Sequence, residues 1–177
     1  IAIRPVVGYQ TYDVEDATDS ETIESYMGGL GVSLTLGPAY VKATASYLQN
    51  PGNYGQTNLL VANGAGVNLT NARLIGDSVE DAELIQGTFV VCMNFSPAFG
   101  IEAGGGYGNA EVDTSATDTA EQTGMLYYLQ APITVAKGVQ IIPEVGMVDR
   151  GELEQTGLDD VDQGTMTYVD VNFRIDF

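Results

Sequence analysis

Hydrophobic and polar residues alternate with a period of two along most of this chain. The alternation is clearest in residues 164–177, where Val169, Val171 and Phe173 share one face while Asp170 and Arg174 share the other. Such a period puts successive side chains on opposite faces of a β-strand, and here the two faces meet different environments. Seven other segments alternate in the same way. The pattern therefore predicts eight strands, at residues 1–12, 24–36, 39–49, 83–95, 98–109, 124–135, 139–150 and 164–177.

The connections between these strands fall into two kinds that alternate along the chain. Tight turns are expected at residues 37–38, 96–97 and 136–138, and long polar loops at 13–23, 50–82, 110–123 and 151–163. An up-and-down antiparallel meander then places every short turn at one rim and every long loop at the other, as in outer-membrane barrels. We expect an all-β fold, a transmembrane β-barrel with eight strands in this chain, and one domain over residues 1–177. A soluble lipocalin-like barrel is the alternative.

Charge follows the same division. The chain has 24 acidic and six basic residues, a net charge of -18, which argues against a nucleic-acid partner because no basic patch can form. Twenty of the acidic residues fall at or beside the four predicted loops. The apolar face of the strands is expected to carry no charge, which fits a lipid environment because a charge there costs about 2–4 kcal/mol at mid-bilayer.

Little in the sequence points to catalysis or to a resident cofactor. There is no histidine, and Cys92 is the single cysteine, so the usual imidazole-based catalysis and zinc sites are excluded. We therefore predict a protein that is not an enzyme and has no catalytic residues, no cofactor and no metal site. The acidic group Asp159, Asp160 and Asp162 lacks the spacing of a calcium loop and is expected to be a solvated surface.

The last strand, Val169-x-Val171-x-Phe173-x-Ile175-x-Phe177, resembles the terminal signature that outer-membrane barrels present to their assembly machinery. The stretches 127–146 and 47–55 resemble porins of sulfate-reducing and related deltaproteobacteria. The resemblance implies an assembly signal at Phe173, Ile175 and Phe177. It also implies passive diffusion of small hydrophilic solutes through a water-filled barrel, commonly a trimer. Those porins are longer than 177 residues, so this chain is expected to be a C-terminal portion of such a barrel.

Charged residues on the polar face of the strands are candidates for the lining of a pore. Seven glycines and one serine on that face would underfill a small closed barrel, which favours a pore over a side-chain plug. The segment 50–82 could fold into the channel and constrict it, with Arg73 and Asp77 as its candidate residues, although a solvated loop is the more favoured interpretation. The candidate pore-lining residues are Arg4, Lys42, Glu102, Glu144, Asp170, Arg174 and Asp176.

These patterns predict a porin of the bacterial outer membrane, in contact with membrane lipid and lipopolysaccharide. The alternative is a small closed eight-stranded barrel with a structural or adhesive role. The short turns are expected to face the periplasm. Because three basic residues offset four acidic ones along the wall, the interior alone should discriminate little between ions. A mild cation preference is expected from the acidic loops, and it should weaken as salt screens them.

Overall fold

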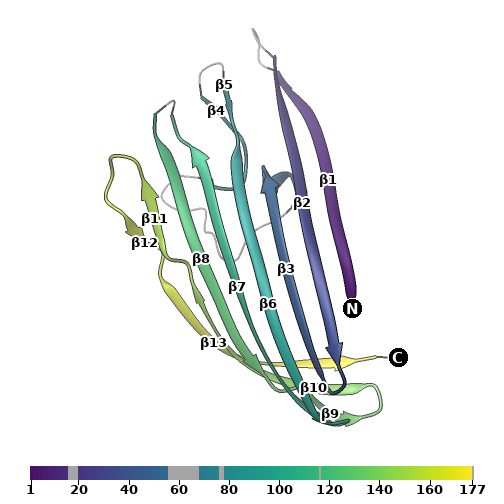
Figure 1. Cartoon of the computed structure of the whole chain (residues 1–177). Coiled ribbons are helices and arrows are strands. Elements are labelled where there is room, and N and C mark those ends of the chain that lie inside the picture. The colour runs from purple at the N-terminus through teal and green to yellow at the C-terminus, as the bar shows by residue number, and fades with distance from the viewer. Residues whose placement is uncertain (16–19, 56–67, 76–77, 116, 177) are drawn as a thin grey trace.

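The computed structural model is one long, curved, antiparallel β-sheet, with a small separate hairpin at the end of the strands opposite the short turns (Figure 1). It describes residues 1–15, 20–55, 68–75, 78–115 and 117–176. No helix in these ranges is long and apolar enough to cross a membrane. The long strands are β1 (Ala2–Glu15), β2 (Ser20–Leu36), β3 (Ala39–Gln49), β6 (Ala82–Ser96), β7 (Phe99–Asp113), β8 (Thr119–Gln130), β10 (Val139–Asp149) and β13 (Thr165–Ile175).

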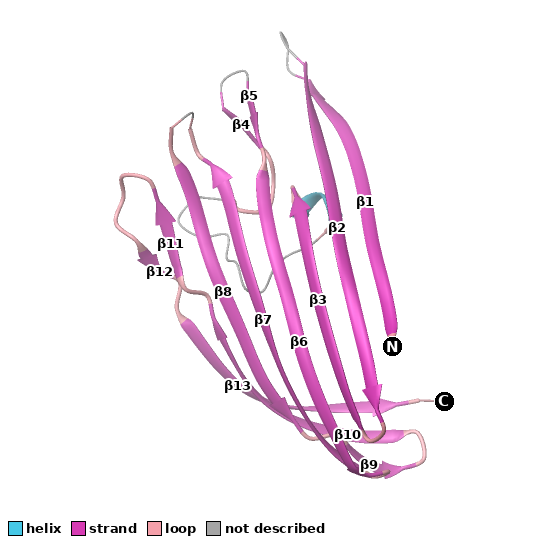
Figure 2. Ribbon diagram, in the orientation of Figure 1, coloured by secondary structure: helices cyan, strands magenta, loops and turns pink. Residues whose placement is uncertain are grey.

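Short elements complete the chain. β9 (Ile133–Ala136) continues the course of β8, and the pair β11 (Glu152–Gln155) and β12 (Val161–Asp162) extends the sheet beyond β8. A 3-10 turn, η1 (Pro51–Tyr54), follows β3 (Figure 2). The hairpin of β4 (Arg73–Ile75) and β5 (Ser78–Glu80) forms a separate two-stranded sheet.

The long strands pair in chain order, which confirms the predicted meander. β1 pairs β2, β2 pairs β3, β3 pairs β6, β6 pairs β7, β7 pairs β8, β8 pairs β10 and β10 pairs β13, all antiparallel. The short turns lie at one end of the sheet, where both chain ends also lie (Figure 1). Among the described residues no pairing joins β1 to β13, so the sheet has two open edges.

Glycine makes two of the short turns possible. Gly37 has a φ of 61° between β2 and β3, and Gly138 has a φ of 76° between β9 and β10. A residue without a Cβ adopts this left-handed region at no steric cost, whereas most residues with a Cβ are strained there. At Gly138 a Cβ would also lie 2.5 Å from the backbone oxygen of Asp176. Both turns lie where the sequence pattern predicted them, at residues 37–38 and 136–138.

The strands extend further towards the long-loop rim than the sequence pattern predicted. β1 continues to Glu15 and β2 begins at Ser20, within the predicted loop 13–23. β7 continues to Asp113 and β8 begins at Thr119, which shortens the predicted loop 110–123. The loops 50–82 and 151–163 likewise contain the short strands β4, β5, β11 and β12. These four loop predictions were wrong in extent, because hydrogen-bonded pairing continues where the apolar pattern stops.

A gap in the ladder interrupts the predicted strand 124–135. Pro143 lies opposite Ala131, and Pro132 separates β8 from β9. The Ala131 amide donates to the Pro143 carbonyl over 3.0 Å, but Pro143 has no N–H with which to return the bond. Pro143 and Pro132 therefore leave a local gap in the pairing of β10 with β8 and β9.

Candidate functional site

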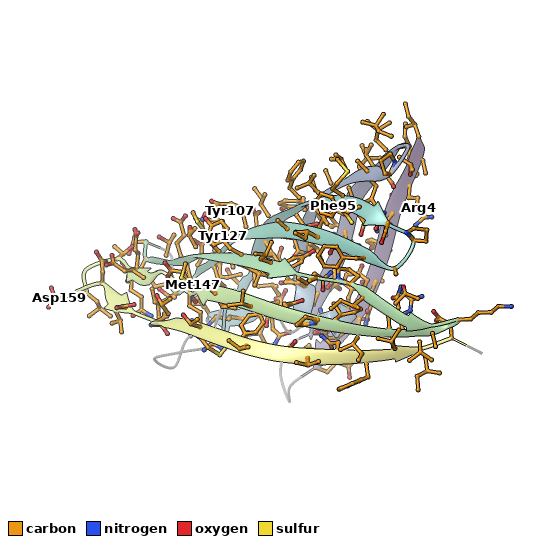
Figure 3. All side chains as sticks on the ribbon, turned by 90° about the horizontal axis from the view of Figure 1, so that it is seen from below. Arg4, Phe95, Tyr107, Tyr127, Met147 and Asp159 are labelled. Atoms are coloured by element: carbon orange, nitrogen blue, oxygen red, sulfur yellow. The ribbon has the colours of Figure 1, made fainter. Side chains whose placement is uncertain are left out.

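The outer face of the sheet is apolar over the half nearer the short turns. Phe89, Val91 and Leu129 are exposed there, with 55%, 42% and 50% of their surface accessible. Tyr107 and Tyr127 lie side by side on the same face (Figure 3). The described charged residues of these strands lie on the opposite face or nearer the long-loop rim. This section is suited to contact with lipid, and we call it the bilayer section.

Beyond the bilayer section the outer face becomes acidic. Glu83 on β6 lies opposite Glu111 on β7, Glu111 lies opposite Glu121 on β8, and Glu121 lies opposite Glu154 on β11. Glu24 also lies on this face, where it accepts a hydrogen bond of 2.9 Å from the Tyr9 hydroxyl. The expectation of a charge-free outer face was therefore wrong near the rim, because the strands continue past the lipid-facing band. We call this part of the sheet the rim section.

The alignment of glutamates changes the titration of the central one. Burial raises the pKa of Glu111 above its ordinary value, and the neighbouring carboxylates Glu121, Asp113 and Glu83 raise it further. Like charges directly opposite each other on neighbouring strands destabilise a sheet. Glu111 therefore takes up a proton more readily than an isolated glutamate does.

The inner face of the bilayer section is polar and formed largely by small residues. Thr44 and Thr88, on neighbouring strands, have hydroxyl oxygens 2.7 Å apart. Around them lie inward glycines, in agreement with the sequence prediction. Two of these glycines are covered by tyrosines: a Cβ on Gly104 would meet the Tyr128 ring at 2.3 Å, and one on Gly146 would meet the Tyr168 ring at 2.3 Å.

Each tyrosine that covers a glycine donates to a carboxylate two residues before that glycine. Tyr128 Oη donates to Glu102 Oε1 over 2.8 Å, and Tyr168 Oη donates to Glu144 Oε1 over 2.7 Å. The same arrangement thus occurs twice, on β7 with β8 and on β10 with β13. The glycine leaves room for the ring to lie along the wall, and the hydroxyl then reaches the neighbouring glutamate.

Glu102 has additional neutral donors and is only 8% exposed. The Gln130 amide donates to its Oε1 over 2.5 Å, and the Tyr40 hydroxyl donates to its Oε2. Cys92, which is buried, lies directly opposite Glu102 on β6. Cys92 is thus a small packed residue on the inner face.

The register aligns three of the predicted wall carboxylates across the sheet. Glu102 lies opposite Gln130, Gln130 lies opposite Glu144, and Glu144 lies opposite Asp170. We call Glu102, Glu144 and Asp170 the carboxylate row. It crosses β7, β8, β10 and β13 at one level of the wall.

The other predicted wall residues lie elsewhere. Arg174 and Asp176 form a pair, with Arg174 Nε 3.2 Å from Asp176 Oδ1, nearer the short turns. Lys42 is on β3, and its Nζ lies 4.3 Å from the centroid of the Tyr40 ring. Arg4 is on β1, and β1 and β13 are the two edge strands of the sheet.

The inner face of the rim section is apolar, although the sequence pattern predicted polar loops there. Its side chains form a buried cluster on β3, β6, β7, β8, β10 and β11, and Leu69 from the segment after η1 packs into it with 0% exposure. We call this the rim core. Its buried members are Leu48, Leu69, Ala82, Leu84, Ala110, Val112, Ala120, Val148 and Leu153.

Polar contacts fix the two ends of the segment 50–82 to the same face. Asn50, at a φ of 52° and fully buried, donates to the Glu24 carbonyl over 2.9 Å and to Asp81 Oδ1 over 2.7 Å. Its own side-chain oxygen accepts from the Ala82 amide over 2.9 Å. Asn50 and Leu69 are therefore both fully buried, which is not expected of a fully solvated loop.

The two candidate constriction residues have different outcomes. Arg73 lies on β4 opposite Glu80, and its Nη1 is buried with no hydrogen-bond partner among the described residues. Asp77 lies outside the described residues. Of the predicted assembly signal, Phe173 and Ile175 are exposed on the outer face, while Phe177 lies outside the described residues.

The main feature of the wall that the sequence pattern did not predict is the packing of tyrosine rings over glycines. The repeated Glu-x-Gly at Glu102–Gly104 and Glu144–Gly146 was visible, but its meaning depends on which tyrosine lies opposite. The sequence also contained a signal for the longer strands, because apolar and polar residues continue to alternate through Ala110, Glu111 and Val112.

Comparisons by structure place this fold among bacterial outer-membrane β-barrels. The outer-membrane expressed OmpT of Vibrio cholerae matches with a TM-score of 0.56 and 14% identity over 98% of this chain and 51% of its own. The in-vitro folded OmpT of the same organism matches with the same score and identity over 98% and 50%. This chain thus spans about half the length of these proteins. The fold agrees with the predicted class and with the predicted location in the bacterial outer membrane.

A third structure, the attachment invasion locus protein Ail of Yersinia pestis, aligns over 98% of this chain and 97% of its own. Its TM-score is 0.29 at 12% identity, too low to carry an argument. No protein-family model matches this sequence, and neither does any curated protein sequence.

Proposed function

We propose that this chain forms part of the wall of an outer-membrane porin, through which small hydrophilic solutes and ions diffuse passively. The observation that carries the proposal is the inner face of the bilayer section, where glycines, threonines and carboxylates replace an apolar core. A face of this kind, opposite an apolar outer face, is what a water-filled membrane barrel requires.

The open edges support a lumen wider than eight strands enclose. An eight-stranded barrel has an interior just wide enough for side chains, whereas barrels of sixteen or more strands leave an aqueous channel. Backbone groups at an open edge would be unsatisfied in hydrocarbon, so β1 and β13 must pair with further strands in the membrane. The half-length match to a larger outer-membrane barrel is consistent with that arrangement.

Conductance tests the proposal directly. The protein purified from the outer membrane of producing cells, reconstituted into planar bilayers, should give stable open steps. Silent bilayers despite verified insertion would exclude the pore.

Cross-linking tests closure separately. In a Cys92→Ala background, Ile3→Cys on β1 would be combined in turn with Val171→Cys, Phe173→Cys and Ile175→Cys on β13. A direct disulfide within one chain would mean that β1 and β13 close an eight-stranded barrel, which is the alternative with a structural or adhesive role. No disulfide in any pair is the result expected for a wider barrel.

The rim core supports a narrowed entrance. Leu69 packs in the rim core, and Asn50 is hydrogen-bonded to Asp81, so described residues of the segment 50–82 are buried near the long-loop rim. We propose that this segment constricts the channel there. The trimeric state, the contact with lipopolysaccharide, the assembly signal and the periplasmic position of the short turns stay predictions, and so does the absence of enzymatic activity.

A further inference from the structure

We infer that the carboxylate row of Glu102, Glu144 and Asp170 makes the channel cation-selective from within its wall. The inference rests on the proposed pore and names the residues that set its specificity. It replaces the expectation, drawn from the number of charges on the wall, that the wall discriminates little between cations and anions. What matters is where the seven wall charges lie relative to one another.

The wall charges are segregated by strand. Arg174 and Asp176 neutralise each other as a pair. The remaining two cations, Arg4 and Lys42, lie on β1 and β3, while the carboxylate row lies on β7, β10 and β13. Strands are spaced about 4.8 Å apart, so the row spans roughly 15 Å of the wall with one sign of charge. A path lined by one sign of charge concentrates the opposite ion.

The side chains that donate hydrogen bonds to the carboxylate row are neutral, so they do not offset its negative charge. Glu102 accepts from two tyrosine hydroxyls and one amide, and Glu144 accepts from Tyr168. Among the described residues the one ion pair found by distance is that of Arg174 with Asp176, outside the row. The tyrosines are fixed in turn because their rings occupy the space left by Gly104 and Gly146. The carboxylates of Glu102 and Glu144 are therefore held in position and not neutralised.

Reversal potentials in a salt gradient test the inference with two variants of equal charge change. The wall variant is Glu102→Gln with Glu144→Gln and Asp170→Asn. The rim variant is Glu152→Gln with Asp159→Asn and Asp160→Asn, which removes three exposed carboxylates beside β11 and β12. Both are studied as the protein purified from the outer membrane. The wall variant should lose the cation preference of the unsubstituted channel, while the rim variant should keep it at moderate and high salt.

The outcomes separate this inference from the function on which it rests. Open channels whose preference survives the wall variant but disappears in the rim variant would overturn the inference and leave the porin intact. Absence of channels in the unsubstituted protein would remove both. If the wall variant does not fold, as judged by heat-modifiable migration, the double variant Glu144→Gln with Asp170→Asn leaves the Glu102 hydrogen bonds intact, and a reduced preference is expected from it. An unchanged preference in that double variant would count against the inference.

Discussion

The bilayer section and the rim section belong to the same strands, yet their faces have opposite polarity. On β7, Tyr107 points outward and Gly108 inward, while four residues further on Glu111 points outward and Val112 inward. The apolar face is thus outer in one section and inner in the other. The backbone pairing continues unchanged through both.

The difference shows that polarity along one strand reports which solvent meets each face. In the bilayer section the outer side chains are apolar, as contact with lipid requires, and the inner side chains are small or polar, as the proposed aqueous lumen requires. In the rim section the outer face is acidic and suited to water, while Leu69 packs against the inner face, so an ordinary buried core forms there. Matched substitutions in the two sections should therefore differ in their effect on stability.

The largest expected effect comes from the rim core. Leu84→Ala on β6 removes a side chain that is 1% exposed, and we expect it to lower the free energy of unfolding by about 2–5 kcal/mol. Thr88→Ala, four residues further on the same face, is the control and should cost about 0.5–1.5 kcal/mol for its hydrogen bond with Thr44. Urea unfolding in lipid vesicles measures both. Equal losses at the two positions would mean that the inner face does not change character.

The outer face gives the next effect. Leu129→Arg places a charge at the middle of the bilayer section, and we expect a loss of about 2–4 kcal/mol in the same unfolding experiment. Glu121→Arg lies eight residues away on the same face of β8, in the rim section. There the new cation meets Glu111 and Glu154, so stability should be unchanged or slightly raised. A comparable loss at both positions would contradict a boundary between the sections.

A smaller effect is expected where tyrosine covers glycine. Gly104→Ala puts a methyl group into the Tyr128 ring, so the ring must move and its bond to Glu102 is lost. A hydrogen bond to a charged group is worth about 1.5–3 kcal/mol, and the loss should be near the lower end because Gln130 and Tyr40 remain. Gly28→Ala is the control, since a Cβ there meets nothing within 4 Å. If Gly104→Ala is as mild as the control, the ring is not held against the wall.

The smallest effect, and the one of opposite sign, belongs to the acidic rim. Glu111→Gln should raise the free energy of unfolding by about 0.2–1 kcal/mol, because it relieves like-charge contacts across two strand pairs. The raised pKa of Glu111 means that the folded protein binds this proton more tightly than the unfolded chain does. The penalty is thus present above the folded pKa and disappears as pH falls through it. Unfolding between pH 4 and pH 8 should show this gain on acidification in the parent protein and a smaller one in Glu111→Gln.

The sequence predicted the sheet well because period-two alternation and turn glycines are local signals. The eight strands, their order and the short turns at Gly37 and Gly138 follow from neighbouring residues alone. It failed where polarity inverted, because Ala110 and Val112 continue the alternation on the face previously occupied by polar residues. A search that requires the apolar residues to stay on one face ends the strand at that point, although the strand itself continues.

The candidate site was predicted residue by residue but not as an arrangement. Glu102, Glu144 and Asp170 were each placed on the inner face from their parity. Their alignment depends on cross-strand register, which the sequence does not state. The contact of Leu69 with the rim core is similarly a product of tertiary packing, in a segment that the pattern could describe only as a polar loop.

The two prolines beside the β8–β9 break have a consequence for the mechanics of the wall. Gly100 donates to the Pro132 carbonyl over 3.1 Å and Ala131 donates to the Pro143 carbonyl over 3.0 Å, and neither proline has an N–H to return a bond. At each of these two adjacent positions, one facing β7 and the other facing β10, a single hydrogen bond replaces the two that a closely spaced antiparallel pair normally makes. Resistance of a sheet to bending and sliding comes from these bonds. We expect the wall to flex first along the line from Gly100 to Pro143, and the amides bordering it to exchange with deuterium sooner than those in the middle of β6 and β7.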